Sequence, residues 1–336
     1  MESIQTTWKL HPYSAENLAE VVEVVNSVNI SLFGVPETDE EEFAADLSLP
    51  GFDPSKDAIC VFDDAGHMLG FAGMWNLNKP GVRRSLYWWI RPEADEPALN
   101  DTLLEWLAER ASQNLEEVDA ELRVMMNGFP FIKQYQKIDC LERHGFEHVR
   151  STYSMLRIFE QAPEKPEIPE GITIRPLDGS EADWLLAAQA NFEAFKDHYG
   201  KIPEPFEHFF ERMKHRMSTT PGIIPQACFL AFEGDRVAGV AINNVKQIEF
   251  PQRGWVDNLG VCKPYRKRGV GLALLLTSFN EFYQRGLTEA GLGVDAGSLT
   301  GALRLYQRAG MEIETEWLNY EKEIRPGKDI VLRSLD

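Results

Sequence analysis

The spacing of apolar residues late in the chain predicts a strand followed closely by a helix. Trp255 to Val261 is a mostly apolar run, which is typical of a buried strand. The stretch Leu272 to Gln284 then has apolar side chains at i, i+4 and i+7, namely Leu275, Phe279 and Phe282. Gly286 follows and is typical of a helix end. The pattern therefore predicts a helix that packs one face on a sheet.

The same order of strand and helix signals occurs twice. The segment TWKLHPYSAENLAEVVEV resembles ITIRPLDGSEADWLLAAQ, and AICVFDDAGHMLGFAGM, two strands around an acidic turn, resembles CFLAFEGDRVAGVAI. A third pair, HGFEHVRSTYSMLRIF and AGMEIETEWLNYEKEI, aligns Gly145 with Gly310 at an offset of 165 residues. The chain is therefore predicted to be a tandem duplication.

The two halves meet at a segment rich in proline and charge, EQAPEKPEIPEG, whose composition favours an extended linker. We expect one domain at residues 1–160, a linker at 161–170 and a second domain at 171–336. With 336 residues and 43% hydrophobic residues, the chain can build a core in each. Both halves predict a strand, helices, a meander of strands, a helix, a strand, a short helix and a long final strand.

The connection between the late strand and helix has the features of an anion-binding loop. It contains the run Arg266, Lys267, Arg268, Gly269, Val270 and Gly271. The glycines permit a tight turn with exposed amides, and the helix that follows directs its partial positive charge to the same place. Three consecutive cations stand against a formal net charge of -19. Neither a Rossmann fingerprint, which needs Gly or Ala where Leu274 stands, nor a P-loop fits.

Two motifs resemble those of the GNAT superfamily of acyl-CoA-dependent N-acyltransferases. VDNLGVCKPY leads into the Arg-x-x-Gly-x-Gly motif formed by Arg266, Gly269 and Gly271. Downstream, GVDAGSLTGALRLYQRAGM resembles the second family motif through Leu305, Tyr306, Gly310 and Met311. The resemblance implies an α/β (α+β) chain of two tandem GNAT domains, each with a mixed, mostly antiparallel central sheet flanked by helices. It also implies acetyl-CoA as the cosubstrate.

The resemblance further implies which residues hold acetyl-CoA. In the family, the strand before the loop splays from the next strand, and the pantetheine arm inserts between the two. In this chain the arm and thioester would contact Leu259, Gly260 and Val261. The diphosphate would contact Arg266, Lys267, Arg268, Gly269, Val270, Gly271 and Leu272. Ser298, or Leu299 if a one-residue gap is allowed, stands where the family often has Asn, and Ser298 is a further expected contact.

Direct attack of an amine on a thioester needs a base for the ammonium, support for the oxyanion and an acid for the thiolate. Tyr306 matches the family's tyrosine beside the thioester sulfur and is the expected general acid. For the base, Glu249, Asp257 and the pair Asp197 and His198 are candidates, and a chain of waters could replace any of them. Asp197 and His198 lie in AFKDHYG, which resembles a segment bordering the acceptor site in tandem GNAT proteins related to mycothiol synthase.

The first half lacks both motifs. Its counterpart of the basic loop, IRPEADEPALN, is acidic and would repel a diphosphate, with Ala98 and Asn100 roughly where the glycines should stand. At the offset of 165 residues, Tyr306 aligns with Leu141. We therefore expect a degenerate domain that does not bind CoA. Trp88, Trp89 and Tyr135 fit its core better than a shared acceptor pocket.

Composition narrows the partners. The acidic balance argues against nucleic acid and is compatible with a cationic amine. Four widely spaced cysteines are expected to be reduced core residues, and the seven histidines form no metal-binding motif, so we predict no metal site. No run of about 18 apolar residues occurs, so we expect a cytoplasmic protein that does not associate with membranes. A monomer is preferred because a tandem pair already contains two domains.

The expected function is transfer of the acetyl group of acetyl-CoA to a primary amine of a small molecule or peptide. The acceptor stays open among a thiol-sugar amine, an aminoglycoside, a polyamine and a peptide N-terminus, and so does the acyl chain length. The alternative is a non-catalytic acyl-CoA-binding protein with an N-terminal interaction domain. Tyr306 favours the enzyme, because a pure binder needs no acid at the sulfur.

Overall fold

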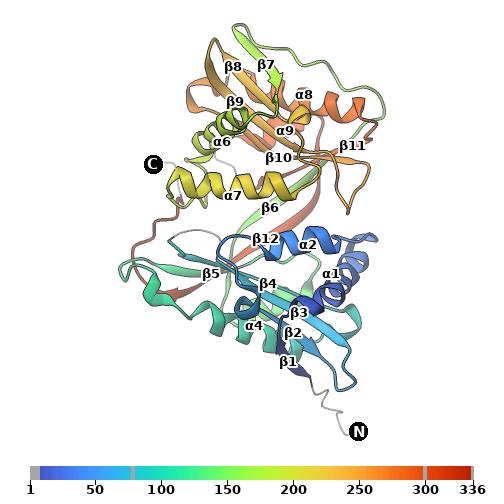
Figure 1. Ribbon diagram of the computed structural model, residues 1–336, viewed down its shortest axis with the longest axis vertical. Helices are drawn as coiled ribbons and strands as arrows, with labels where there is room; N and C mark the ends of the chain where they lie inside the picture. The colour runs from blue at the N-terminus through green and yellow to red at the C-terminus, as the bar shows by residue number, and fades with distance from the viewer. Residues whose placement is uncertain (1–7, 77–79, 298–300, 334–336) are drawn as a thin grey trace. The chain divides into compact units, whose positions relative to one another are not determined.

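The computed structural model describes residues 8–76, 80–297 and 301–333, which form two compact units (Figure 1). The N-terminal unit comprises the described residues up to Val149 together with Leu318–Ile330. The C-terminal unit comprises Arg150–Trp317 and the described residues from Val331 onwards. The predicted domain boundaries at residues 160 and 171 describe the two halves of the sequence repeat and stay a prediction. The compact units differ from it because the last strand of each half crosses into the other unit.

In the N-terminal unit the strand order is β1-β2-β3-β4-β5-β12. Neighbouring strands are antiparallel except β4 and β5, which are parallel. The strands are β1 Lys9–Pro12, β2 Ala58–Phe62, β3 Met68–Trp75, β4 Arg83–Ile90, β5 Val124–Gly128 and β12 Glu312–Arg325. The helices are α1 Leu18–Phe33, α2 Glu40–Leu47, α3 Pro54–Asp57, α4 Pro97–Ala111 and α5 Tyr135–Arg143.

In the C-terminal unit the strand order is β6-β11-β10-β9-β8-β7, and only β10 and β11 are parallel. The strands are β6 Glu147–Ile158, β7 Ile172–Pro176, β8 Phe229–Glu233, β9 Arg236–Asn244, β10 Arg253–Val261 and β11 Glu289–Asp295. The helices are α6 Glu181–Phe195, α7 Phe206–Thr219, α8 Val270–Gln284 and α9 Ala302–Arg308. The predicted mixed, mostly antiparallel sheet flanked by helices is confirmed.

Corresponding glycines mark the end of the last helix in each half. Gly145, after α5, has φ 75°, and Gly310, after α9, has φ 77°. Both angles lie in the left-handed region that side chains with a Cβ rarely adopt, so glycine suits both positions. A long strand follows each glycine, β6 in one case and β12 in the other. The two halves therefore share this helix-to-strand connection, as the 165-residue offset predicts.

Close packing fixes α8 against β10. The predicted core face is buried, with Leu275, Phe279 and Phe282 all at 0% exposure, and each such side chain contributes roughly 1.5–3 kcal/mol of hydrophobic stabilisation. Gly254 lies directly beneath Phe282, because a Cβ added there would come within 2.3 Å of the ring. The start of α8, and with it the basic loop, is thereby held at a fixed place beside the sheet.

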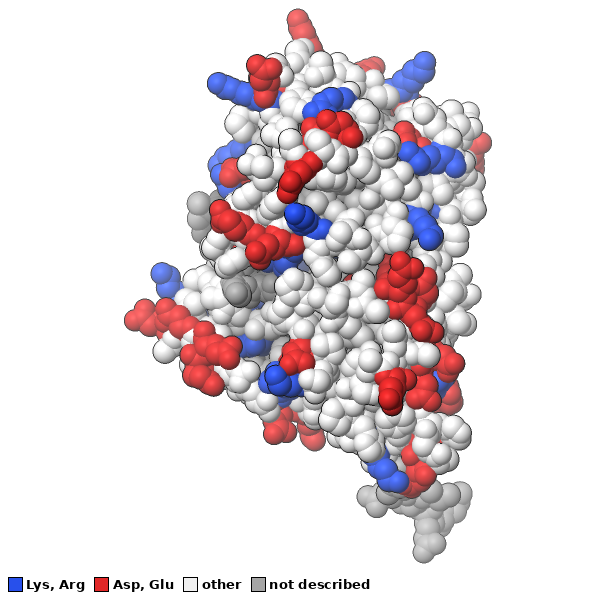
Figure 2. Space-filling view, viewed as in Figure 1, with Lys and Arg blue, Asp and Glu red and all other residues white. Residues whose placement is uncertain are grey.

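Acidic side chains form several groups on the face shown in Figure 2, whereas basic side chains stand mostly singly. This agrees with the net charge of -19, and it means that any gathering of cations is a local feature. Among the described residues, no helix is both long and apolar enough to cross a membrane.

Candidate active site

The two parallel strands β10 and β11 separate partway along their length. They pair from Arg253 opposite Glu289 to Val256 opposite Leu292, and β10 then continues to Val261 without β11. Over Leu259–Val261, β10 still pairs with β9 on its other side. One edge of this strand segment therefore offers backbone N–H and C=O groups to a ligand, as the resemblance implied for the pantetheine arm.

A cavity of about 830 Å³ lies where the strands separate, within the range of small-molecule sites. It is lined on one side by β10, the basic loop and the start of α8, and on the other by α9. The residues predicted to hold the donor that line it are Leu259, Gly260, Val261, Arg266, Lys267, Gly269, Gly271, Leu272 and Tyr306. Ser298 lies outside the described residues, so its predicted contact stays a prediction.

The start of α8 has the geometry of an anion site. Its N-cap is Gly269, with φ 88°, and no side chain caps the helix within the described part of the chain. The first helical backbone bond at this end is donated by Ala273 to the Gly269 carbonyl, at 3.0 Å. The amides of Val270, Gly271 and Leu272 consequently have no acceptor inside the helix and carry its partial positive charge.

The three cations of the loop differ in their partners. Arg268 Nη2 lies 2.6 Å from a carboxylate oxygen of Glu233, and Arg266 forms a bidentate pair with Asp197. Lys267 has no ion pair among the described residues and adopts φ 63° without being glycine. Of the three predicted cationic contacts, Lys267 is therefore the one whose side chain is available to a phosphate.

Sequence analysis missed two further cations on the opposite wall. Arg304 and Arg308 of α9 line the cavity together with Lys263, and within the described ranges none of the three forms an ion pair. The signal was present in the segment RLYQR, whose basic residues are four apart and so share a helix face. The cavity therefore brings unpaired positive charge from both walls.

Arg266 acts as a tie within the protein. Its guanidinium contacts both Asp197 oxygens, at 2.5 and 2.8 Å, and donates to the carbonyls of Val261 and Ala194, at 3.1 and 2.8 Å. The hydrogen bonds from Arg266 hold the pKa of Asp197 below its usual value. Asp197 was predicted to contact the acceptor, but its carboxylate is committed to Arg266. The predicted acceptor contact His198 does line the cavity, and burial lowers its pKa.

Tyr306, the predicted general acid, comes from α9 and is only 8% exposed. Burial raises the pKa of its phenol to about 12, so the group stays protonated at neutral pH. Tyr306 and residues of the basic loop line the same cavity, so the structure brings the two sequence motifs together.

Of the base candidates, His198 lines the cavity, whereas Asp257 and Glu249 do not. Asp257 stands at an irregularity of β10 between Val256 and Asn258, and its side chain is 6% exposed. One carboxylate oxygen accepts from Arg216 at 2.6 Å, and the other is buried with no hydrogen-bond partner among the described residues. Burial raises the pKa of Asp257, against the influence of Arg216. Glu249 lies half-buried in the β9–β10 connection.

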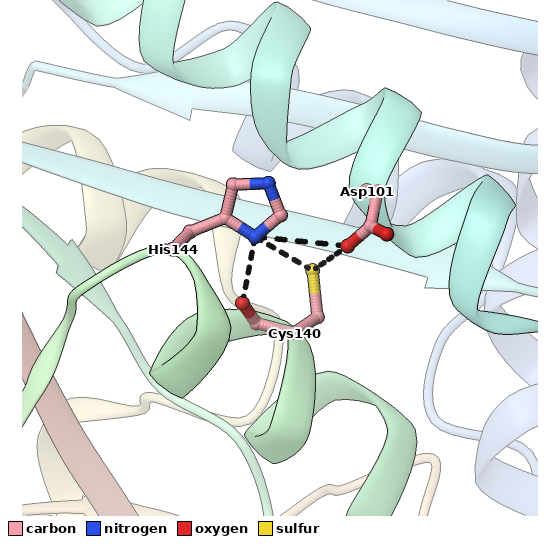
Figure 3. A group of neighbouring side chains, drawn as sticks. All are labelled: Asp101, Cys140 and His144. Atoms are coloured by element: carbon pink, nitrogen blue, oxygen red, sulfur yellow. Dashed lines mark hydrogen bonds and ion pairs between the residues drawn. The ribbon is translucent and has the colours of Figure 1, made fainter.

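One group of potential metal ligands occurs in the described N-terminal unit: Asp101 of α4 with Cys140 and His144 at the end of α5 (Figure 3). The Cys140 thiol donates to Asp101 at 3.4 Å, and His144 Nδ1 lies 2.9 Å from the Cys140 carbonyl. Arg143 pairs with the same carboxylate at 2.8 Å, and burial raises the pKa of the thiol to about 12. A hydrogen-bonded cluster accounts for this arrangement, and the absence of a metal site stays a prediction.

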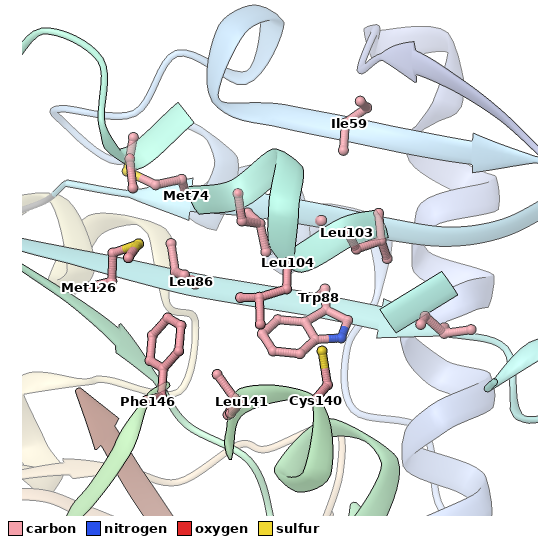
Figure 4. Close-up of a cluster of buried hydrophobic side chains, with 14 of the residues drawn as sticks. Ile59, Met74, Leu86, Trp88, Leu103, Leu104, Met126, Cys140, Leu141 and Phe146 are labelled. Carbon is pink, nitrogen blue, oxygen red and sulfur yellow. The ribbon is translucent and has the colours of Figure 1, made fainter. Parts of the chain in front are cut away.

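The counterpart of Tyr306 in the N-terminal unit belongs to its core. Leu141, which aligns with Tyr306, is fully buried, and it packs with Trp88, Leu86 and Phe146 (Figure 4). Trp88 fits the core prediction at 1% exposure. Tyr135 does not, because 73% of it is exposed at the start of α5.

Comparisons with known proteins agree with this geometry. Residues 189–311 match the sequence model of the Acetyltransferase (GNAT) family. A mycothiol acetyltransferase of Thermobispora bispora is 32% identical over 178 residues, which cover 52% of this chain and 56% of that protein. The chain thus spans about half the length of the curated relatives it matches. A crystal structure of a GCN5-related N-acetyltransferase from Sphaerobacter thermophilus superposes with a TM-score of 0.78 at 28% identity, over 97% of this chain and 98% of that one.

A tandem GNAT protein from the clavulanic acid biosynthesis pathway has the same fold, with a TM-score of 0.72 at 10% identity over 96% of this chain and 100% of its own. The fold is therefore that of a tandem GNAT protein. In its motif region and in the geometry of its cavity, the chain is similar to the GNAT acetyltransferases.

Proposed function

We propose that the C-terminal unit transfers the acetyl group of acetyl-CoA to a primary amine. The observation that carries this proposal is a cavity, lined by the end of β10, that combines an uncapped helix start with a buried tyrosine. The diphosphate of acetyl-CoA matches the helix start, and its thioester matches the end at Tyr306. A ligand-free scaffold would need neither the exposed amides nor the unpaired cations.

The donor would be held mainly by backbone groups. The amides of Val270, Gly271 and Leu272 would donate to the diphosphate, with Lys267 adding a full positive charge. The free edge of Leu259–Val261 would pair with the amides of the pantetheine arm. Lys263, Arg304 and Arg308 would supply charge to the remaining phosphate of the donor. In this arrangement Arg266 positions the loop through Asp197 instead of contacting the diphosphate with its side chain.

The reaction would proceed by direct attack. A base removes one proton from the acceptor ammonium, and the neutral nitrogen forms a bond to the thioester carbonyl carbon. The resulting tetrahedral oxyanion collapses, the C–S bond breaks, and the sulfur leaves with the electron pair. Tyr306 supplies a proton to the departing thiolate and recovers one as the amide nitrogen loses its second proton. The products are an N-acetyl amide and free CoA thiol.

The raised pKa of Tyr306 bears on its role. A phenol with a pKa of about 12 is a weaker acid than an exposed tyrosine, but it remains fully protonated and keeps its hydrogen for the sulfur. The thiolate would form in the same buried surroundings, which raise the proton affinity of sulfur too. Burial therefore raises the pKa of the phenol that donates this proton and that of the thiol that receives it.

Asp257 is the better-placed base of the two proposed carboxylates. It precedes the cavity-lining Leu259 by two residues, and one of its carboxylate oxygens is buried without a hydrogen-bond partner among the described residues. Because its pKa is raised, the acid limb of kcat against pH should lie above the usual range of an aspartate. We expect Asp257→Asn to lower kcat by roughly 10²-fold and to remove that limb. Glu249→Gln is the matched control, and a larger loss there would reassign the base.

The acceptor is proposed as a primary amine of a small molecule or peptide. The name of the Thermobispora bispora relative, mycothiol acetyltransferase, makes the amine acceptor of that enzyme the first to test. Aminoglycosides, polyamines and peptide N-termini complete the panel.

The deciding experiment is calorimetry with acetyl-CoA, followed by amine-dependent thiol release across this panel. Binding with turnover of any amine supports the proposal. Binding without turnover of any amine would favour the alternative of a non-catalytic acyl-CoA-binding protein. If acetyl-CoA does not bind, the donor site is wrong.

A further inference from the structure

Residues 331–333 pair with a loop that borders the cavity. The Gly200 amide donates to the Leu332 carbonyl at 2.8 Å, and the Leu332 amide donates to the Lys201 carbonyl at 3.0 Å. These two backbone hydrogen bonds join segments about 130 residues apart in the sequence. The loop concerned follows α6 and carries Asp197, His198 and Tyr199.

Tyr199 contacts two arginines of the same unit. The Arg150 guanidinium is 3.9 Å from the centre of its ring, and that of Arg333 is 5.8 Å away. Arg333 also donates to the Tyr199 hydroxyl at 3.0 Å. Cation–π contacts and a charged hydrogen bond from two arginines thus hold one side chain in place. We call Arg150, Tyr199, Leu332 and Arg333 the Tyr199 bracket.

The bracket is connected to both walls of the cavity. On one wall, Asp197, two residues before Tyr199, holds Arg266 and with it the basic loop. On the other wall, Arg150 contacts Asp295 at the end of β11 and the Gly297 carbonyl, each at 2.5 Å. Asp295 and Gly297 precede α9, which carries Arg304 and Tyr306. None of the four bracket residues lines the cavity itself.

We propose that the Tyr199 bracket is a positioning device that orders the 197–201 loop and thereby sets the basic loop and the approach to α9 for the donor. The proposal rests on the proposed function for its effect on acetyl-CoA. Its structural part, the ordering of the loop by residues outside the cavity, stands independently of that function. A donor that meets a disordered loop must first order it, so its affinity falls.

The test compares matched pairs of variants in the full chain. Tyr199→Leu removes both the ring and the hydroxyl, whereas Tyr199→Phe keeps the ring against Arg150. Leu332→Pro removes the amide that donates to Lys201, whereas Leu332→Ala keeps it. For Tyr199→Leu and Leu332→Pro we expect the Kd of acetyl-CoA to rise about tenfold, and for Tyr199→Phe about threefold, with Leu332→Ala close to wild type.

Two readouts separate positioning from general damage. Hydrogen exchange should accelerate in residues 197–201 of Tyr199→Leu and Leu332→Pro while β8 and β9 keep wild-type protection. At saturating acetyl-CoA, kcat should fall less than twofold, because the donor then supplies the order that the bracket lost.

Wild-type exchange in the 197–201 segment of Tyr199→Leu would overturn the proposal, as would unchanged acetyl-CoA affinity in a variant whose loop exchanges faster. If wild-type protein does not bind acetyl-CoA, the proposed function fails, and the exchange data alone then decide whether the bracket orders the loop.

Discussion

The two units contain the same splayed pair of parallel strands and use it differently. In the N-terminal unit, β4 and β5 pair from Arg83 to Leu86 of β4, and β4 then continues to Ile90 without β5, still paired with β3. In the C-terminal unit, β10 does the same beyond Val256. The second separation opens into a cavity, whereas at the first a side chain of the unit itself bonds the strand. A pair of separating parallel strands is therefore not sufficient to form a donor site.

The difference lies in a few side chains. Lys137 of α5 donates to the Trp88 carbonyl at 2.5 Å, beyond the end of the β4–β5 pairing, and lies 4.6 Å from the indole ring. Asn100 donates to the Glu96 carbonyl at the start of α4 and accepts from the Trp88 indole. At the start of α8 the corresponding positions are Gly269, Val270 and Gly271, beside the cations of the basic loop. On β10 the Arg266 side chain bonds only the Val261 carbonyl within the described residues, at the end of the strand, and the cavity is open to a ligand.

The largest effect should come from an acidic side chain at the start of α8. Gly271→Glu places a carboxylate beside the proposed diphosphate, and a Cβ added at Gly271 would lie only 3.1 Å from the Leu305 side chain. We therefore expect the affinity for acetyl-CoA to fall by more than about 100-fold. Calorimetry measures this loss. Ala98→Glu, at the same second position of α4, is the control and should change nothing. Equal losses in both variants would show that the units do not differ as described.

Tyr306→Phe should separate binding from chemistry. Removing the phenol hydroxyl is expected to lower kcat by roughly 10²-fold while leaving the Kd of acetyl-CoA within about twofold, because the ring still fills its place. Steady-state thiol release and calorimetry give the two numbers. Tyr265→Phe changes another tyrosine that lines the same cavity and should retain activity. Full activity in Tyr306→Phe would remove the tyrosine from the mechanism.

Lys137→Met should change how stability depends on pH. Burial lowers the pKa of Lys137 from 10.5 to about 8, so below pH 8 the folded state keeps a charge that costs it free energy. Above pH 10.5 the amine is neutral in both states. Relative to Lys137→Met, wild type should therefore gain at most about 3 kcal/mol between these pH values. Denaturant unfolding measures this, and a flat difference would contradict it.

The smallest effects concern two residues with left-handed backbone. Among the described residues, Asn114 and Lys267 are the non-glycine residues with positive φ, one in each unit. Lys267→Gly should stabilise the protein by about 1 kcal/mol yet weaken acetyl-CoA binding several-fold through the lost charge. Asn114→Gly should leave binding unchanged. Melting temperatures and calorimetry test both, and unaltered binding in Lys267→Gly would assign the phosphate charge to the other cations.

Local sequence patterns predicted much of the fold. The face formed by Leu275, Phe279 and Phe282 predicted α8 because its period is that of a helix, and the repeat offset placed Gly145 and Gly310 correctly. The basic loop and Tyr306 were found by their motifs, which depend on spacing along the chain. These features are local, so the sequence records them directly.

Partnerships across the fold were not readable in this way. Nothing in the spacing of Asp197 and Arg266 shows that the two form a bidentate pair, since a hydrogen bond between distant segments leaves no periodic trace. The same holds for Arg304, whose place on the cavity depends on how α9 packs. The exposure of Tyr135 was missed because its neighbours resemble a buried helix face.

The final strand of each half pairs within the other unit, and this limits how the duplicated gene can be divided. Residues Thr152–Ile158 of β6 pair with β11, and residues Tyr320–Arg325 of β12 pair with β5. A gene cut at the linker would thus deprive each sheet of an edge strand and release that strand unpaired into the other product. The duplicated copies are no longer interchangeable modules. The N-terminal half therefore cannot be removed without loss to the C-terminal unit, because the sheet of that unit includes β6, the final strand of the N-terminal half.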